Sequence, residues 1–336
     1  MKARIIAAFA VVYLVWGSTY LGIRWAVESF PPFVMTASRF LVAGALLYLL
    51  ARLRGVPAPP RRAWLPATLI GTLLITGGNG LVVWAEQRVP SGLTALIVAG
   101  MPLWVAVFER VAPGGKPLSL TRVAGLLLGF GGLALLVTGS TPESAAGCGS
   151  ASTPCGAASD VPLFYLLTVP LASISWALGS VASRRVRLPA NQVLTSAMNM
   201  MAGGAVALLI ALVTGELRGF SPAQLSASSV AAWAYLVVFG SMLAFTCFTW
   251  LVSVVEPTRV ATYAYVNPVV ALVLGAWLAG EPVGSRILLA TPIILVGLAL
   301  VLRSKPRAGE SGSESSAGRR AASRPSNPGQ PADTAA

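Results

Sequence analysis

The sequence predicts an all-α polytopic membrane protein with ten transmembrane helices, arranged as two inverted five-helix repeats with both termini in the cytoplasm. The first observation is composition: of 336 residues, 55% are hydrophobic and only 10% are charged, and the mean hydropathy is +0.75. Soluble domains carry about 25% charged residues, so too few charges are present to cover a water-facing surface. The other two observations are long apolar runs and an internal repeat.

The apolar runs set the number of helices. About 20 residues cross the hydrocarbon core as a helix, because the core is about 30 Å thick and each residue advances about 1.5 Å. Nine or eleven spans are the alternatives, since some runs are short. The first run follows only four residues and resembles a signal peptide, but it lacks a clear small-residue cleavage site, so we expect it to stay as a helix. The ten runs are 5–24, 33–51, 65–85, 92–109, 121–139, 162–182, 193–213, 231–252, 260–279 and 287–302.

The orientation follows from the lysines and arginines. With the N-terminus in the cytoplasm, 19 of the 24 fall in cytoplasmic segments, four fall in outer loops, and Arg39 lies within a helix. Basic residues concentrate on the cytoplasmic side of membrane proteins, so this split predicts that both termini are cytoplasmic in the cell membrane. The net charge of +13 would otherwise suggest nucleic acid, but these charges lie in short loops, and we expect a lipid bilayer and no nucleic acid as the partner.

Two halves are visible in the sequence. At one constant offset along the chain, Trp84 matches Trp250 and Pro102 matches Pro268, and Trp16 is similarly echoed by Trp176. Five helices in each half would insert the second half upside down, and inverted repeats place a site at their interface near mid-membrane. We expect a first repeat over 1–140, an extracytoplasmic connecting loop over 141–161, a second repeat over 162–302 and a disordered basic cytoplasmic tail over 303–336.

Short motifs carry a resemblance to a known family. They are Leu14-Val15-Trp16-Gly17-Ser18-Thr19-Tyr20, Ala37-Ser38-Arg39-Phe40, Gly78-Asn79-Gly80, Ser175-Trp176-Ala177-Leu178-Gly179-Ser180 and Tyr263-Ala264-Tyr265-Val266-Asn267-Pro268-Val269. As a set they resemble the EamA domains of the drug/metabolite transporter superfamily, over roughly residues 5–302. The resemblance implies efflux of small metabolites, amino acids among them, or of drugs.

The resemblance has two departures. Family members often carry a Gly-Glu pair after the fourth and ninth helices, and here only Gly280-Glu281 fits, because the earlier position reads Pro113-Gly114-Gly115-Lys116. We therefore assign no shared role to that acidic position. The loop 140–161 is also longer than usual.

Arg39 is the strongest candidate for binding a substrate. It lies about six residues, or about 9 Å, into the second run, where a charge costs roughly 2.5–3.5 kcal/mol to insert. That cost is normally reduced by a cavity or a partner. The functional interpretation is that Arg39 binds an anionic substrate group such as a carboxylate. The alternatives are that it reaches outward to the interface or pairs with Glu86.

Glu86 is the candidate for proton coupling. It lies at the outer end of the third run, and no other acidic residue lies well inside a span. Burial without a partner would raise the pKa of a carboxyl group, whereas pairing with Arg39 would keep it ionised. The alternative is an ordinary exposed carboxylate at a helix end. The proton is accordingly a candidate coupling ion.

Asn79 and Asn267 are candidate polar contacts to a substrate. Asn79 follows two glycines and precedes a third, which leaves the backbone able to deform. Asn267 precedes Pro268, which removes a helix donor and frees a carbonyl. Interhelical hydrogen bonds and close packing are the alternatives for both.

Four aromatic residues complete the predicted binding set. Trp16, Trp176, Tyr263 and Tyr265 can line a cavity and stack on an apolar or cationic group. Belts at the membrane surface use the same residue types, but Trp16 and Trp176 lie well inside their runs. The GxxxG of Gly125 and Gly129 predicts close helix packing, either within the chain or in a homodimer.

Other functions are excluded by what the sequence lacks. There is no histidine, no P-loop and no CxxC, so we expect no metal, no cofactor and no enzyme. Cys148 and Cys155 in the outer loop could form a disulfide. The residues favour a secondary transporter for a small-molecule substrate, with a passive channel or facilitator and an intramembrane enzyme as alternatives.

Overall fold

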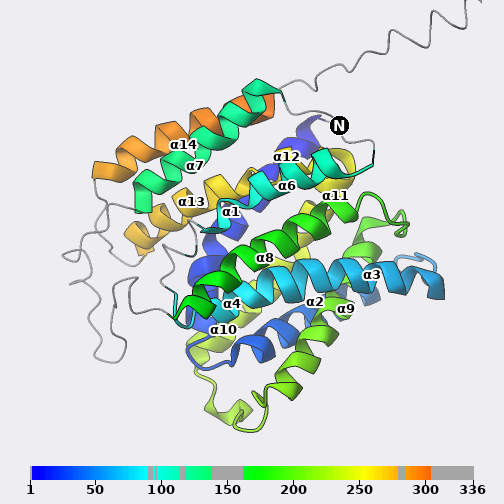
Figure 1. Ribbon diagram of the computed structural model, residues 1–336. Coiled ribbons are helices and arrows are strands. Elements are labelled where there is room, and N and C mark those ends of the chain that lie inside the picture. Colours follow the sequence, from blue (N-terminus) through cyan, green and yellow to red (C-terminus); the bar gives the residue numbers. More distant parts are fainter. Residues whose placement is uncertain are drawn as a thin grey trace, which may run out of the picture.

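The computed structural model describes residues 2–89, 94, 97–113, 119–137, 162–278 and 285–303 (Figure 1). All regular structure in these residues is helical. The predicted loop with Cys148 and Cys155 and the tail from 304 lie outside the described residues. The α-helices of the first half are α1 (Lys2–Ala26), α2 (Pro32–Leu53), α3 (Trp64–Gly71), α4 (Leu81–Ala85), α6 (Met101–Val111) and α7 (Leu120–Val137). Those of the second half are α8 (Leu163–Ala182), α9 (Gln192–Val213), α10 (Ala227–Tyr235), α11 (Thr246–Val254), α12 (Pro257–Val260), α13 (Tyr263–Leu278) and α14 (Ser285–Arg303).

Six of the ten predicted spans correspond to long apolar helical segments, whereas the predicted span 92–109 contains a turn at 99–100 and its helix α6 begins only at Met101. Six helical segments are long and apolar enough to cross a membrane: Lys2–Ala26, Pro32–Leu53, Arg61–Ala85, Leu163–Ala182, Gln192–Val213 and Ala227–Val254. The described part of the chain is therefore all-helical, with several candidate membrane spans. The count of ten spans and the orientation of the termini stay predictions.

Two of these segments contain a feature that the apolar pattern did not predict. The third helix of each half changes in its middle from α-helix to π-helix, over η2 (Thr72–Gly80) and η6 (Leu236–Phe245). The offset that relates Trp84 to Trp250 places 72–80 on 238–246, so the two π-helices are equivalent in the predicted repeat. π-Helices are rare and occur frequently at functional sites.

The second helix of each half also ends in the same way. Gly55 and Gly215 both take a left-handed backbone conformation, with φ of 77° and 78°. The next residue donates its N–H to a carbonyl five positions earlier, from Val56 to Ala51 and from Glu216 to Ala211, at 3.0 Å in both cases. The two glycines are as far apart along the chain as the starts of α2 and α9, and as the ends of these helices. The two halves thus share local backbone structure as well as sequence.

Equivalent helices pack against each other across the two halves. When the offset that relates Trp84 to Trp250 is added to the bounds of α7, the result is 286–303, which is close to the bounds of α14. α2 packs along α9, and α7 packs along α14, which lie side by side in Figure 1. A Cβ on Gly125 would lie 2.8 Å from the carbonyl oxygen of Gly297, and a Cβ on Gly297 would lie 2.6 Å from the nitrogen of Gly129. The GxxxG motif therefore serves contact between α7 and α14, which is the intrachain alternative.

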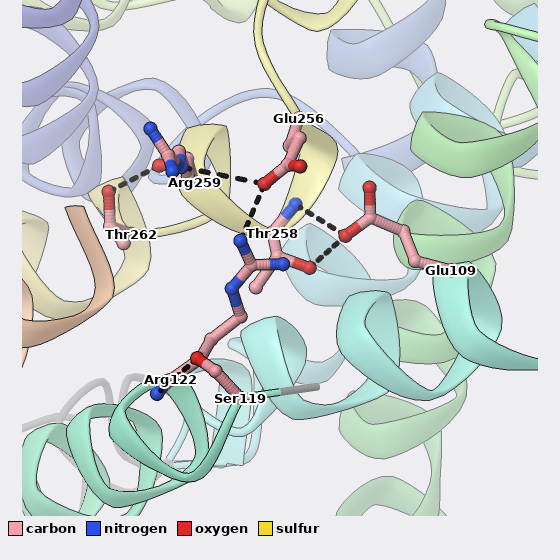
Figure 2. A network of polar contacts seen from close by, with 7 residues as sticks. All are labelled: Glu109, Ser119, Arg122, Glu256, Thr258, Arg259 and Thr262. Carbon is pink, nitrogen blue, oxygen red and sulfur yellow. Dashed lines mark hydrogen bonds and ion pairs between the residues drawn. The ribbon is translucent and has the colours of Figure 1, made fainter. Parts of the chain in front are cut away.

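A polar network joins the halves at one end of the bundle, where α6 and α11 finish and α7 and α12 begin (Figure 2). We call this the basic end, because the predicted cytoplasmic loops lie there. Arg122 donates to the Glu256 carboxylate at 2.6 Å, and Arg259 lies 3.4 Å from the same oxygen. Glu109 accepts hydrogen bonds from the backbone N–H and the hydroxyl of Thr258. Helices of both halves are thereby tied together at this end.

Candidate functional site

A central cavity lies between the two halves. Both π-helices contribute to its wall, together with α1, α2, α8 and α13. The empty space, its opening included, is about 720 Å³. Polar and aromatic residues of the wall include Trp16, Thr19, Tyr20, Arg39, Asn79, Ser173, Trp176, Tyr263 and Asn267.

Six of the seven residues predicted to contact a substrate line this one cavity. They come from five different helical segments: Trp16, Arg39, Asn79, Trp176, Tyr263 and Asn267. The seventh, Tyr265, does not line it. Its hydroxyl donates to the carbonyl of Leu126 at 3.1 Å, and its ring packs on Gly129. Tyr263 and Tyr265 are two residues apart on one helix, so they face different directions, and Tyr265 fills the core beside α7.

Arg39 is buried, with 3% of its surface exposed. Its Nε donates to the Ser241 hydroxyl at 2.8 Å, and its guanidinium carbon lies 4.7 Å from the centre of the Phe40 ring. Nη1 has no hydrogen-bond partner among the described residues. Neither alternative for Arg39 is observed: it does not reach the surface, and the ion pairs of the described residues do not include one with Glu86. A buried cation is therefore presented to the cavity with one nitrogen unused.

The position of Arg39 depends on two residues that the sequence analysis missed. Ser241 orients the guanidinium, and Gly240 makes room for it, because a Cβ at 240 would lie 2.8 Å from Nη2. The Gly240 carbonyl also accepts the Trp16 indole N–H at 3.1 Å. In the sequence, the one indication of their role is that two small residues lie together in the middle of the apolar run 231–252. Only the fold shows that they face α2.

The aromatic residues pack as a cluster on one side of the cavity. The Trp16 ring centre lies 5.5 Å from that of Trp176 and 4.8 Å from that of Tyr263, both edge to face. Phe245 and Phe248 extend the cluster from the second half. The rings of this cluster that line the cavity form an apolar wall beside the Arg39 cation; they are Trp16, Trp176, Phe245 and Tyr263.

Asn79 lies within the π-helix η2, and its Oδ1 is buried without a hydrogen-bond partner among the described residues. The glycine before it allows α8 to come close, because a Cβ on Gly78 would lie 2.5 Å from the Trp176 ring. Asn267 differs. With its amide nitrogen as donor it bonds to the carbonyls of Tyr263 at 3.1 Å and Tyr13 at 3.3 Å. The bond to Tyr13 is the interhelical bond that the sequence left as an alternative.

Glu86 follows directly on α4 and does not line the cavity. Its Oε1 is buried and has no hydrogen-bond partner among the described residues. Glu86 is therefore half-buried with one enclosed carboxyl oxygen, rather than the exposed helix-end carboxylate of the alternative.

The described residues contain no group of three or more Cys, Asp and Glu side chains placed to hold a metal ion. Cys247 is a free thiol. Cys148 and Cys155 lie outside the described residues, and their pairing stays a prediction.

Comparisons with known proteins agree with this picture. The model of the EamA-like transporter family matches residues 3–138 and 163–303, that is, twice along the chain. A protein of Escherichia coli (strain K12) named uncharacterized inner membrane transporter YedA is 39% identical over 299 residues, which cover 89% of this chain and 90% of that protein. The uncharacterized transporter YvbV of Bacillus subtilis (strain 168) is 27% identical, covering 89% of this chain and 92% of that protein.

A solved structure titled "Crystal structure of protein" supports the fold. It superposes with a TM-score of 0.68 at 21% sequence identity, covering 89% of this chain and 97% of that chain. At this identity the likeness shows the fold alone.

Proposed function

Because the chain belongs to the EamA-like transporter family, we propose that this membrane protein is a secondary active transporter that exports a small metabolite with a carboxylate, such as an amino acid. The observation that carries the proposal is Arg39, a buried cation in the wall of the central cavity with Nη1 unused. A carboxylate can accept two hydrogen bonds from one guanidinium group, which makes arginine suited to this task.

The rest of the cavity fits the non-acidic part of such a solute. Trp16, Trp176 and Tyr263 supply flat apolar surface, and the Asn79 Oδ1 supplies an unused acceptor that suits an amine or hydroxyl group. A hydrophobic drug without a carboxylate would use the aromatic wall but would leave Arg39 without a counter-charge. Burying an uncompensated charge is costly, so the cavity favours an anionic or zwitterionic solute.

The transport cycle proposed is alternating access between two inverted five-helix repeats. We propose ten spans, with both termini in the cytoplasm. Support comes from the equivalent π-helices, the equivalent ends of α2 and α9, and the packing of equivalent helices on each other. Inverted repeats can exchange conformations, so that a central site opens first to one side and then to the other.

Glu86 is the proposed proton-coupling residue. The observation that supports this role is one buried carboxyl oxygen without a hydrogen-bond partner among the described residues. A carboxyl group in such a place can change its protonation as the cavity opens and closes. Arg39 would then hold the solute while Glu86 exchanges the proton.

The test is uptake by proteoliposomes of radiolabelled amino acids and cationic drugs under an imposed pH gradient. A carrier of carboxylates takes up one class of carboxylate, shows counterflow, and loses uptake in Arg39→Ala. Uptake that follows the pH gradient in the wild type and ignores it in Glu86→Gln supports proton coupling. The exposed Glu28→Gln is the matched control and should behave as the wild type.

Other outcomes would overturn parts of the proposal. Flux that rises linearly with concentration and shows no counterflow would identify a passive facilitator. Uptake of cationic drugs that survives Arg39→Ala would remove the carboxylate site. Wild-type counterflow without any response to the gradient would dismiss Glu86 as the coupling group and leave the carrier intact.

A further inference from the structure

A second cavity lies at the basic end of the bundle. It is formed where α8 finishes, α9 begins and α11 finishes, and its empty space, opening included, is about 880 Å³. Its wall combines polar and apolar residues, and Ser183, Thr195, Asn199, Thr249 and Ser253 are among the polar ones. Neither the family resemblance nor the predicted site residues assigned any role to this region.

The repeat relates this second cavity to the central one. Asn199 lies at the place in α9 that Arg39 has in α2, counted from the start of each helix. The offset that relates Trp84 to Trp250 also relates Leu74 to Gly240 and Val82 to Phe248. In each of these three pairs one member lines the central cavity and the other lines the second cavity. The second cavity is therefore the counterpart, at the basic end, of one part of the central cavity.

The charge of the second cavity favours an anionic group, and its buried amide offers an acceptor to an amine or hydroxyl group of the same solute. Among the described residues that line it, Arg184 is the only charged one, and none is an aspartate or glutamate. Asn199 is 1% exposed, and its Oδ1 has no hydrogen-bond partner among the described residues. A buried amide with an unused atom needs a water molecule or a solute group for its hydrogen-bonding capacity. Both cavities thus combine one arginine with one unpartnered asparagine oxygen.

Phe248 lies between the two cavities. It lines the second cavity, and its ring centre is 5.1 Å from that of Trp16, 5.4 Å from that of Trp176 and 6.0 Å from that of Tyr263. These three partners line the central cavity. Its counterpart in the first half is the smaller Val82. The large side chain of this equivalent pair therefore lies on the side of the second cavity, where it separates that cavity from the central one.

We propose that the second cavity is an access site for anionic solutes at the basic end, and that the Phe248 side chain is the barrier between it and the central cavity. The carboxylate of the solute is attracted by Arg184, its amine or hydroxyl group donates to the Asn199 Oδ1, and the solute reaches Arg39 when the Phe248 side chain changes rotamer. The proposal rests on the proposed transport function, because it gives the solute its route. It assigns the selection for negative charge to two sites in series.

The first test measures the charge preference of the second cavity with thiol reagents. Ser253→Cys is made in a background with Cys148, Cys155 and Cys247 replaced, and is treated in inside-out vesicles with an anionic or a cationic methanethiosulfonate. The anionic reagent should be favoured relative to its rate on a free thiol, and Arg184→Gln should lower that preference about threefold. Ala58→Cys, an exposed residue in the loop after α2, is the control, and its preference should not respond to Arg184→Gln. An unchanged preference at 253 would overturn the anion site.

The second test measures the barrier. Thr19→Cys places a thiol in the wall of the central cavity, and the anionic reagent is again applied from the cytoplasmic face. Phe248→Ala should raise the rate of modification about tenfold, because the closed population falls, and Phe248→Leu should raise it less. Phe245→Ala is the matched control: Phe245 is equally buried but lines the central cavity and not the second one.

The outcomes separate this inference from the proposed function. Thiol modification needs no transported solute, so a failed uptake experiment leaves these results valid. Two outcomes would overturn the barrier while leaving any measured uptake in place. One is that the thiol at Thr19→Cys is modified at the same rate whether Phe248 is kept or replaced by leucine or alanine. The other is that Phe245→Ala increases this rate as much as Phe248→Ala does. Phe248→Leu changes the volume least, so it keeps the test decisive if Phe248→Ala does not fold.

Discussion

Arg39 in α2 and Asn199 in α9 occupy equivalent places in the two halves, yet only one of them carries a charge. Both are buried, both lie on the helices that pack across the two halves, and each lines one of the two cavities. The repeat therefore preserves the backbone and the buried polar position while the side chain differs. The first half thus supplies the charge that we propose to bind an anion, and the equivalent place in the second half holds a neutral amide.

The largest effect is expected when the charge of Arg39 is removed. Arg39→Gln should reduce transport of a carboxylate at least about 100-fold, because a buried charge-assisted pair with the solute is lost. Asn199→Ala at the equivalent place should reduce it less than about tenfold, since a neutral hydrogen bond contributes about 1 kcal/mol. Initial uptake rates in proteoliposomes measure both. Equal losses would show that the two halves contribute alike.

Arg39→Lys refines the same comparison. Lysine keeps the charge but cannot present two parallel N–H groups or bond to Ser241 through Nε. Transport should fall between that of the wild type and that of Arg39→Gln, with a weaker apparent affinity. Full activity in Arg39→Lys would mean that charge alone decides and that the contact to Ser241 is not needed.

Gly240→Ala should have the next largest effect, because it disturbs Arg39 without touching its charge. The added Cβ would lie 2.8 Å from Nη2 and 3.0 Å from the Thr19 methyl group. A displaced binding group costs affinity steeply, so we expect the apparent affinity for a carboxylate to fall about tenfold while the maximal rate changes little. Gly131→Ala is the control, since nothing lies within 4 Å of a Cβ there. A matched loss in both variants would contradict a specific role for Gly240.

Arg39 and the two residues that position it show how much of the candidate site could be predicted from the sequence. Arg39 was predictable, because a charge within an apolar run is costly unless a cavity or partner receives it. The lining positions of Trp16 and Trp176 were predictable from their depth in the runs, and that of Asn79 from the glycines that flank it. Ser241 and Gly240 were not, because their role depends on which helix faces α2, and apolar periodicity does not determine that in a membrane. Tyr265 was misplaced for the same reason.

The π-helices mark a second limit of prediction. Hydropathy determined the bounds of 65–85 and 231–252 within a few residues, since it measures length in the bilayer. It does not measure the backbone hydrogen-bonding pattern, so the change from α- to π-helix over Thr72–Gly80 and Leu236–Phe245 could not be predicted. Asn199 and Phe248 were likewise ordinary residues of apolar runs until the fold placed them beside a cavity.

A smaller effect is expected where the halves are joined at the basic end. Glu256 accepts from Arg122 at 2.6 Å and lies 3.4 Å from Arg259, and the Arg122 side chain is only 8% exposed. Glu256→Gln leaves a mostly buried guanidinium without its carboxylate, which should cost about 1–3 kcal/mol of stability. The expected result is a Tm several degrees lower in detergent. Glu28→Gln, in an exposed loop position, should leave the Tm unchanged, and an unchanged Tm in Glu256→Gln would show that the pair contributes nothing.

The smallest effect concerns the equivalent residues Val56 and Glu216, which follow the left-handed glycines. Only Glu216 has gained a polar role: its carboxylate accepts from the N–H groups of Phe33 at 2.8 Å and Val34 at 3.1 Å, at the start of α2. Burial raises the pKa of the Glu216 carboxyl above its ordinary value of 4.5, although these two bonds oppose the shift. The folded state then binds this proton more tightly than the unfolded state does, so the stability gained from it is complete below pH 4.5 and is lost as the pH rises through the raised pKa.

The Tm of Glu216→Gln minus that of the wild type should therefore increase with pH across that interval, by no more than about 2 °C, and become constant above it. Thermal unfolding in detergent at a series of pH values measures this difference. Val56→Gln removes no titrating group and should give a Tm difference that is flat with pH. A flat difference for Glu216→Gln as well would show that the carboxyl titrates as it does in the unfolded chain.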